Sequence, residues 1–226
     1  MADVLFDWTL DHGRCVGVTL PEADDAITAM AAESLLPEER AAAAAFGAVR
    51  RRAWVGGRVA MREALARIGK TALPILADER GAPRLPPGIV GSISHKDHVA
   101  VALVATEDRG GERVGVDVEI DAPRKRDIAA KVLRPEELAT LEGMGAEERA
   151  RAVLLRFSAK EAVYKALDPY LKRYVGFLEI AVTLEDDGTG EVTPHLPAGD
   201  GAFAFEVRWM RMGGLMVTTA RVTAGG

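Results

Sequence analysis

The chain has 226 residues, of which 48% are hydrophobic and 28% are charged, and its formal net charge is −5. This length fits one domain or two small ones, and the balance of apolar and charged residues excludes global disorder. The acidic charge gives no reason to expect nucleic-acid binding, and the single cysteine, Cys15, excludes an internal disulfide. No apolar run approaches the ~20 residues of a membrane span, and the acidic N-terminus is unlike a signal peptide. We therefore expect a cytoplasmic protein.

The first half of the chain is predicted to combine a long helical segment with β-strands. Residues 37–68 lack proline after their start and include an alanine run of high helix propensity, although glycines at 47, 56 and 57 are expected to interrupt or bend the helix. Prolines and glycines between residues 74 and 88 indicate an irregular connection. Runs rich in β-branched residues then predict strands over 89–94, 99–105 and 114–120.

A Gly110-Gly111 pair precedes the third of these strands, and we place a domain boundary there, between halves 1–110 and 111–226. The second half continues with a helix that begins near Pro135 and a long helix over 147–167, which Asp168-Pro169 is expected to end. Further apolar alternation predicts strands over 178–184, 203–210 and 215–222. Helices mixed with antiparallel strands predict an α+β fold class.

Two carboxylates lie two residues apart in the predicted strand Gly115-Val-Asp-Val-Glu119. Since alternate residues of a strand share a face, Asp117 and Glu119 project together, and their mutual repulsion is costly without a cation. Carboxylates of this kind hold Mg²⁺, which keeps several waters and often binds substrate phosphates as well. Taken alone, the pentapeptide is more typical of a solvated strand edge, so a metal site needs support from elsewhere in the chain.

The long predicted helix supplies a third carboxylate. Glu161 and Lys165 lie four residues apart and face each other, which is typical of an ordinary surface pair. Glu161 could instead complete a metal site with Asp117 and Glu119. Lys160 and Lys165 could then contact the phosphates that such a metal binds.

Basic and imidazole side chains of the first half are candidates for phosphate contacts. Four arginines occur between residues 50 and 58, and in a helix Arg51 and Arg58 would share a face. Arginine binds phosphate with a planar, bidentate fork, and Arg80 is a weaker candidate of the same kind. His95 ends a predicted strand, where imidazole could bind phosphate or move a proton near neutral pH. A charged helix face and a structural histidine are the alternatives.

Taken together and in this order, the segments resemble the 4′-phosphopantetheinyl transferases. The blocks Gly115-Val-Asp-Val-Glu119 and Phe157-Ser-Ala-Lys-Glu-Ala-Val-Tyr-Lys-Ala166 are similar to the two most specific motifs of that family. Ser92-Ile-Ser-His95 and Leu171-Lys-Arg-Tyr-Val-Gly-Phe177 resemble the branch that includes enterobactin synthase component D and the activators of siderophore and polyketide assembly. The chain departs from that branch at Lys96, where cysteine is frequent.

The resemblance implies two similar α+β halves in a pseudo-twofold arrangement, with coenzyme A bound in the cleft between them. It implies transfer of the 4′-phosphopantetheine group of coenzyme A to a serine of an apo acyl, aryl or peptidyl carrier protein. The products would be holo-carrier protein and 3′,5′-ADP. Because a pyrophosphate is broken, a divalent cofactor is expected, Mg²⁺ or else Mn²⁺.

The resemblance also implies roles for the candidate residues. The expected metal ligands are Asp117, Glu119 and Glu161. Glu161 is expected to accept the serine proton, directly or through a metal-bound water, and Lys165 to stabilise or protonate the leaving phosphate, with His95 as a further catalytic group. Contacts to coenzyme A are expected from Arg51 (or Arg50, by register), Arg58, Arg80, Ser94, His95, Lys160 and Lys165.

The expected partners are coenzyme A and a carrier protein of siderophore, nonribosomal peptide, polyketide or fatty-acid assembly, and the enzyme is expected to be a monomer. Carrier proteins are generally acidic around the modified serine, so we expect a basic docking patch over 123–133, with a solvated helix start as the alternative. Two other functions compete. One is a metal-dependent hydrolase of the coenzyme A pyrophosphate, and the other is a non-catalytic module that binds coenzyme A or a carrier protein.

Overall fold

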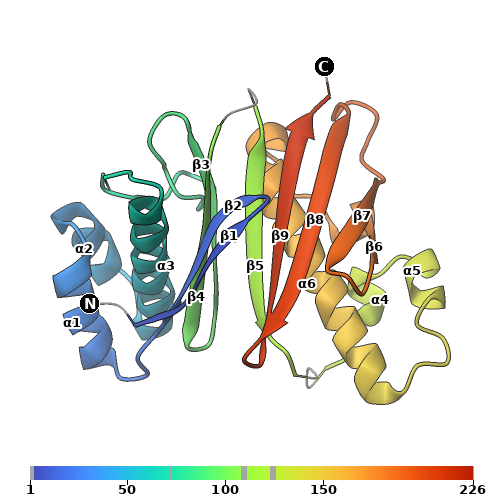
Figure 1. Ribbon diagram of the computed structural model, residues 1–226, viewed down its shortest axis with the longest axis horizontal. Helices are drawn as coiled ribbons and strands as arrows, with labels where there is room; N and C mark the ends of the chain where they lie inside the picture. The colour runs from blue at the N-terminus through green and yellow to red at the C-terminus, as the bar shows by residue number, and fades with distance from the viewer. Residues whose placement is uncertain (1–2, 72, 108–110, 123–125, 226) are drawn as a thin grey trace. The chain divides into compact units, whose positions relative to one another are not determined.

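The computed structural model describes residues 3–71, 73–107, 111–122 and 126–225 (Figure 1). The chain divides into two compact units, Met1–Asp108 and Arg109–Gly226. Gly110, the first residue of the predicted boundary pair, lies outside the described residues. Each unit has one long helix against an antiparallel sheet, which confirms the predicted α+β class.

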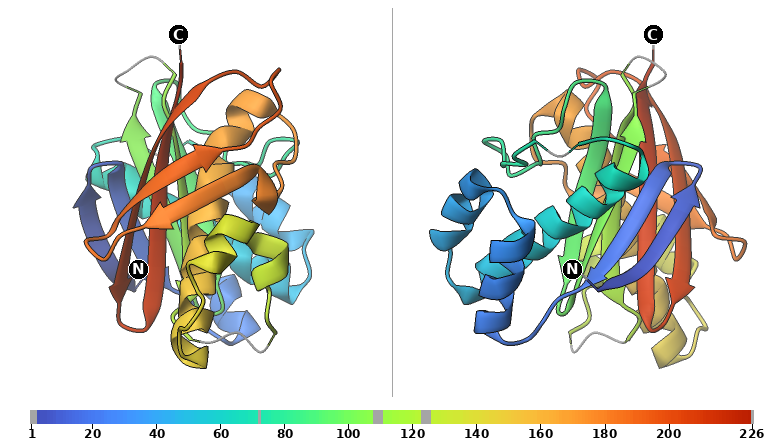
Figure 2. Two further views of the ribbon diagram at one scale, coloured as in Figure 1. Left: turned by 90° about the vertical axis from the view of Figure 1, so that its right-hand side faces the viewer. Right: turned by 60° about the vertical axis from the view of Figure 1, so that its left-hand side comes forward.

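The first unit has a four-stranded antiparallel sheet with the strand order β1-β2-β4-β3. Its elements in chain order are β1 (Val4–Leu10), β2 (Gly13–Thr19), α1 (Asp24–Ser34), α2 (Pro37–Ala44), α3 (Ala48–Arg67), β3 (Ile89–Lys96) and β4 (Val99–Thr106). Figure 2 shows α3 along one face of this sheet. The hairpin of β1 and β2 was not predicted, because Asp7 and Arg14 interrupt the apolar pattern. In the sheet these two residues form an ion pair, with Arg14 Nε 2.5 Å from Asp7 Oδ1.

The predicted helical segment 37–68 is interrupted at Gly47, as its glycine indicates, and forms two helices. Gly47 occupies the N-cap position of α3 with an extended backbone, so the chain turns between α2 and α3. The Gly56-Gly57 pair, in contrast, lies inside the continuous helix α3. A Cβ atom built on Gly56 would lie 2.4 Å from the side chain of Leu20. The glycines therefore allow close packing of α3 on the sheet and do not interrupt the helix.

The second unit has a five-stranded antiparallel sheet with the order β5-β9-β8-β7-β6. Its elements are β5 (Arg113–Ile120), α4 (Ala129–Val132), α5 (Pro135–Ala139), α6 (Ala146–Leu171), the 3₁₀ helix η1 (Phe177–Glu179), β6 (Ile180–Leu184), β7 (Thr189–Pro194), β8 (Phe203–Met212) and β9 (Leu215–Ala224). The long helix α6 packs on β5 and β9, and α4 and α5 lie beside it in the left view of Figure 2.

Two features of the second unit differ from the predictions. Pro169 lies within the last turn of α6, and the helix continues to Leu171 before Lys172 takes the left-handed conformation with φ 51°. A proline so close to the end removes one helical hydrogen bond where the helix is already ending. Strand β7 was not predicted, because its half-buried and exposed residues show little apolar alternation.

The main hydrophobic cluster of each unit lies between its long helix and its sheet. Val59 of α3 and Val104 of β4 belong to one cluster, and Val163 of α6 and Val207 of β8 belong to another. Among the described helices, none has the length and apolar character needed to cross a membrane.

Candidate active site

Strand β5 presents a glycine and two acidic residues on the face that α6 covers. Gly115, Asp117 and Glu119 alternate along the strand and therefore share a face. A Cβ atom built on Gly115 would lie 1.9 Å from the carbonyl oxygen of Ala162 in α6, which is far inside van der Waals contact. The glycine therefore lets the helix backbone approach the strand, and the two carboxylates that follow are buried beside the helix.

The carboxylate of Asp117 is bound by two residues of α6. Ser158 Oγ donates to Asp117 Oδ2 at 2.8 Å, and Lys165 Nζ donates to Oδ1 at 2.9 Å. Lys165 also donates to the Val116 carbonyl at 2.9 Å, and Ser158 Oγ lies 2.9 Å from Thr218 Oγ1 of β9. Because Asp117 is only 6% exposed, the ammonium group compensates a charge that is largely removed from water.

The other two predicted metal ligands lie on the same pair of elements. Glu119 is 6% exposed and is paired with Met216 in the β5–β9 ladder, whereas Glu161 is half-buried on α6, three residues after Ser158. Among the described residues, no three Asp, Glu, His or Cys side chains form a group that could hold a metal ion. The expected three-carboxylate cluster is therefore not assembled in this structure, where the charge of Asp117 is balanced by a lysine.

Asp117 and Glu119 nevertheless fit a divalent cation of the Mg²⁺ type. This ion usually keeps several waters and is bound by one or two carboxylates together with substrate phosphates, not by a closed protein cage. The two carboxylates share one face of β5, and an ionised carboxylate has about four acceptor positions.

Lys160 lies on a different side of α6 from Lys165. The two lysines are five positions apart in the sequence, which places them about 140° apart around the helix. The ammonium group of Lys160 donates to the carbonyls of Val132 at 2.8 Å and Phe177 at 3.1 Å, and to Glu137 Oε2 at 2.6 Å. Its three N–H groups are therefore directed at protein oxygens, and its side chain is almost fully buried. This environment differs from the phosphate contact that the sequence predicts for Lys160.

The two arginines predicted to share a face of α3 lie in different environments. Arg51 is partly exposed and forms an ion pair with Asp24 at the start of α1. Arg58 is 6% exposed, stacks on Trp54 with its guanidinium carbon 3.5 Å from the ring centroid, and donates through Nε to the Ile75 carbonyl at 3.0 Å. Burial lowers the pKa of Arg58 to about 10. Its Nη2 is buried and has no hydrogen-bond partner among the described residues.

The other candidates for coenzyme A contacts in the first unit lie on a loop and on β3. Arg80 is exposed in a loop that Asp78 organises, because Asp78 Oδ1 accepts the N–H groups of Arg80 at 2.8 Å and Ala82 at 2.9 Å. Ser94 and His95 are consecutive in β3 and therefore project to opposite faces of the sheet. Ser94 is buried and His95 is exposed.

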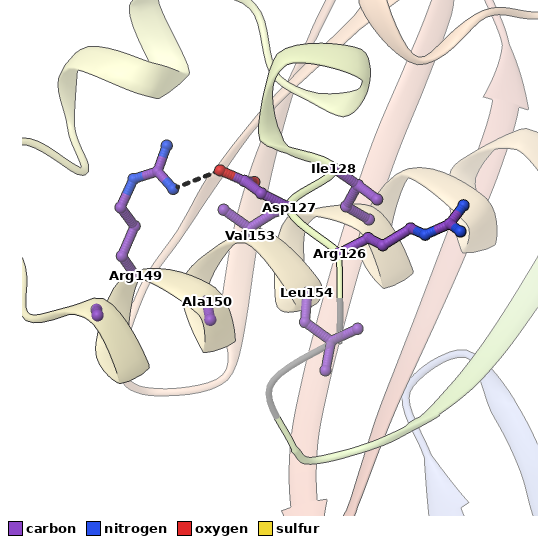
Figure 3. Close-up of a pocket in the computed structure, with 8 residues that line it drawn as sticks. Arg126, Asp127, Ile128, Arg149, Ala150, Val153 and Leu154 are labelled. Atoms are coloured by element: carbon purple, nitrogen blue, oxygen red, sulfur yellow. Dashed lines mark hydrogen bonds and ion pairs between the residues drawn. The ribbon is translucent and has the colours of Figure 1, made fainter.

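A cavity of about 170 Å³ lies between α6 and the segment that leads into α4. Its lining residues are Arg126, Asp127, Ile128, Ala146, Arg149, Ala150, Val153 and Leu154. Figure 3 shows apolar side chains between the guanidinium groups of Arg126 and Arg149. Arg149 Nη1 also lies 3.1 Å from Asp127 Oδ2. Arg124 and Lys125, two cations of the predicted docking patch, lie outside the described residues.

Sequence reasoning missed three residues that contact the predicted site residues. Ser158 precedes Lys165 by seven residues, or two helical turns, and this spacing could have placed both side chains on one face of α6. Glu137 and Thr218 come from α5 and β9. No local spacing relates either of them to the long helix, so the sequence offered no signal for them.

Comparisons with known proteins match both units of the chain. A family model for the 4′-phosphopantetheinyl transferase superfamily matches residues 113–217, and one for the 4′-phosphopantetheinyl transferase N-terminal domain matches residues 38–105. The chain is 34% identical over 182 residues to 4′-phosphopantetheinyl transferase Npt of Nocardia iowensis, covering 75% of this chain and 81% of that protein. It is 34% identical over 122 residues to enterobactin synthase component D of Salmonella typhi, covering 53% of this chain and 49% of that protein. Among solved structures, the holo-[acyl-carrier-protein] synthase of Thermotoga maritima matches with a TM-score of 0.41 and 23% identity, over 50% of this chain and 63% of that chain.

Proposed function

The chain belongs to the 4′-phosphopantetheinyl transferase superfamily, and from this premise we propose which residues perform its reaction. As an enzyme of this class, it transfers the phosphopantetheine group of coenzyme A to apo carrier proteins. The likeness to enterobactin synthase component D supports a carrier protein of siderophore, nonribosomal peptide or polyketide assembly as the substrate.

The pyrophosphate of coenzyme A is assigned to the place where β5 and α6 meet. Asp117 and Glu119 would hold Mg²⁺ there, and the chemistry that the ion supplies is neutralisation of the pyrophosphate oxygens. Lys165 has three N–H donors, of which the described contacts with Val116 and Asp117 use two. We assign the third to the phosphate of the leaving 3′,5′-ADP. The observation that supports this assignment most directly is the 2.9 Å contact between Lys165 and Asp117, because it holds the ammonium group beside the carboxylates.

Glu161 is assigned as the group that accepts the proton of the carrier serine. The serine oxygen forms a bond to the phosphorus next to pantetheine, and the bond from that phosphorus to the oxygen of 3′,5′-ADP breaks. The serine proton passes to Glu161, and Lys165 donates to the departing phosphate oxygen. These two side chains are one helical turn apart on α6, so the proton acceptor and the cation lie next to each other along the helix. Proton transfer by a positioned side chain contributes about 10²- to 10⁴-fold in rate.

The nucleotide end of coenzyme A is assigned to the first unit. Arg51 can exchange its partly exposed ion pair with Asp24 for a phosphate at little cost, and the buried Nη2 of Arg58 has no partner among the described residues. Lys160 is left out, because its ammonium group is engaged by protein oxygens. The full proposed set is Arg51, Arg58, Arg80, Ser94 and His95. We also propose a cytoplasmic, monomeric enzyme, which cell fractionation and analytical ultracentrifugation would test.

The carrier protein is assigned to the cavity at the N-terminal half of α6. Arg126 and Arg149 border it with positive charge, and Ile128, Val153 and Leu154 supply its apolar surface. Acidic helices of a carrier protein would complement this combination of charge and apolar area. The assignment retains residues 126–128 of the predicted docking patch, whereas Val132 and Leu133 of that patch are buried in the cluster around α4.

The function is tested by intact-mass spectrometry of an apo carrier protein incubated with the enzyme, coenzyme A and Mg²⁺. We expect the carrier to gain one phosphopantetheine group, and we expect the gain to disappear with EDTA and with Glu161→Gln. Lys165→Met should lower kcat by about 10²-fold or more, because the departing phosphate loses its cation.

Other outcomes of the same assay identify the competing functions. Consumption of coenzyme A without any carrier modification would indicate a pyrophosphate hydrolase. Binding of coenzyme A without consumption, across acyl, aryl and peptidyl carriers, would indicate a binding module. A phosphopantetheine gain that survives both EDTA and Glu161→Gln would contradict the assigned site and leave the transferase activity in place.

A further inference from the structure

We propose that the ion pair between Lys160 and Glu137 positions the carrier-docking segment on the catalytic helix and makes no contact with coenzyme A. The proposal rests on the transferase function assigned above. The sequence predicts a phosphate contact for Lys160. The proposal instead gives Lys160 a role in the enzyme's affinity for its protein substrate. We call Lys160, Glu137 and the carbonyl groups of Val132 and Phe177 the anchor.

The two faces of α6 serve different parts of the second unit. Ser158 and Lys165 lie on the face toward β5, where both contact Asp117. Val153 and Phe157 pack in a separate hydrophobic cluster with residues of α4 and with Phe177 of η1. Lys160 follows them at the i, i+4, i+7 spacing of one helix face. The anchor therefore continues the contact of α6 with α4, α5 and η1, away from the proposed pyrophosphate site.

The Lys160 end of the anchor is fully satisfied by protein groups. Its ammonium group donates to Val132 O at 2.8 Å, Glu137 Oε2 at 2.6 Å and Phe177 O at 3.1 Å, which matches its three N–H groups. The residue is 2% exposed. Burial lowers the pKa of Lys160, and the hydrogen bond with Glu137 opposes that shift. A phosphate could reach this ammonium group only if buried hydrogen bonds broke and left Glu137 uncompensated, which is strongly unfavourable.

The Glu137 end connects further elements. Glu137 is 4% exposed, and its Oε2 accepts the backbone N–H of Arg134 at 2.8 Å while Oε1 accepts the backbone N–H of Val182 at 2.9 Å. The carboxylate of Glu137 thus joins the start of α5 to β6. Its ion pair with Lys160 also joins both of these elements to α6. The anchor as a whole links α4, α5, α6, η1 and β6.

The anchor fixes the position of one wall of the proposed docking cavity. Ile128, which lines that cavity, immediately precedes α4, and α4 ends at Val132, whose carbonyl accepts from Lys160. The opposite wall consists of α6 residues such as Val153 and Leu154. If the anchor is removed, α4 can shift relative to α6 and the cavity changes shape. The Asp117–Lys165 contact lies on the other face of α6 and stays in place.

The proposal is tested by steady-state kinetics of the full-length enzyme with Lys160→Met, Glu137→Gln and the double variant Lys160→Met/Glu137→Gln. We expect the KM for the carrier protein to rise on the order of tenfold in each variant, with the KM for coenzyme A and kcat changed by less than about threefold. The increases in carrier KM caused by the two single variants should not be additive, because both variants break the same contact. Lys70→Met, which removes an exposed lysine from the first unit, is the matched control and should leave both KM values unchanged.

The double variant keeps the test decisive if a single variant fails to fold. Replacing both members of a buried ion pair with neutral residues avoids an uncompensated buried charge, and a glutamine at residue 137 keeps an amide oxygen that can accept a backbone N–H, so we expect the double variant to unfold cooperatively. A raised KM for coenzyme A or a kcat loss, with an unchanged carrier KM, would show that Lys160 acts on coenzyme A and would overturn the proposal. A double variant that does not fold, or that has the wild-type carrier KM, would also overturn it. If the wild-type enzyme modified no carrier at all, the proposed function itself would fail.

Discussion

Gly115 of β5 lies directly against Ala162 of α6, so closely that a Cβ on the glycine would be 1.9 Å from the Ala162 carbonyl oxygen. This contact sets how far α6 stands from β5. Two residues further along the same face, Asp117 receives hydrogen bonds from Ser158 and Lys165 of that helix. The geometry of the proposed pyrophosphate site therefore depends on the absence of a side chain at residue 115.

Gly115→Ala is expected to destabilise the protein by about 1–3 kcal/mol, because the added methyl group overpacks the contact between helix and strand. It should also reduce kcat, since moving α6 away from β5 lengthens the Lys165–Asp117 contact. Urea unfolding and steady-state kinetics would measure both effects. Gly199→Ala is the control, because a Cβ there meets nothing within 4 Å. Equal stability of the two variants would contradict the packing argument.

Arg51→Gln is expected to weaken coenzyme A binding about tenfold to a hundredfold, the range for losing a hydrogen bond to a charged group. Titration calorimetry with coenzyme A and with dephospho-coenzyme A isolates the 3′-phosphate. The wild type should prefer coenzyme A, and Arg51→Gln should lose most of that preference.

The parallel variant Arg50→Gln decides the register that the sequence left open. Arg50 is exposed and lies over the Phe46 ring, with its guanidinium carbon 4.3 Å from the ring centroid, so we expect little effect on binding. If Arg50→Gln and not Arg51→Gln removed the preference for the 3′-phosphate, the assignment would move by one residue.

Arg126→Glu is expected to raise the KM for an acidic carrier protein several-fold and to leave coenzyme A binding unchanged. The reason is local: the reversed charge repels an acidic partner at the rim of the cavity, where electrostatics mainly affect association. The effect should therefore shrink as salt is raised from about 50 to 500 mM. Arg40→Glu on α2 of the first unit is the control. Carrier kinetics that are the same for both variants at low salt would remove this docking surface.

Part of the folding stability that the protein loses in acid should come from the contact between Arg173 and Glu179. Its Nη2 lies 2.5 Å from Glu179 Oε2, and this hydrogen bond holds the pKa of Glu179 below its usual value of 4.5. A carboxylate whose pKa is lowered by folding contributes stability that is complete above the unfolded pKa and is lost as pH falls through the folded one. The stability difference between wild type and Arg173→Gln should thus be largest near neutral pH and shrink below about pH 4.

Urea unfolding at several pH values measures that difference. Both side chains are partly exposed, so we expect it to be small and further reduced by salt. A difference that stays constant from neutral pH to about pH 3 would show that the contribution of Arg173 does not depend on the ionisation of Glu179.

Patterns in the amino-acid sequence predicted the fold class, the long helix of the second unit and the family of this protein. Alternation in β5 placed Asp117 and Glu119 on one face, and the motif order identified the family that the comparisons then confirmed. The α+β class and the long C-terminal helix followed from local periodicity. The predictions of strand faces and of the long helix succeeded because each depends on neighbours within about one helical turn or two strand residues.

The tertiary structure decided which partner each of these side chains has. Lys160 and Lys165 occur in one motif and were both predicted to contact phosphate, but only Lys165 reaches Asp117, while Lys160 reaches Glu137 in α5. Likewise, the bend expected at Gly56-Gly57 is a close packing contact. A helix has residues on all sides, and its own sequence does not state which element covers which side. That choice depends on contacts between segments far apart in the chain, which form only when the whole unit packs.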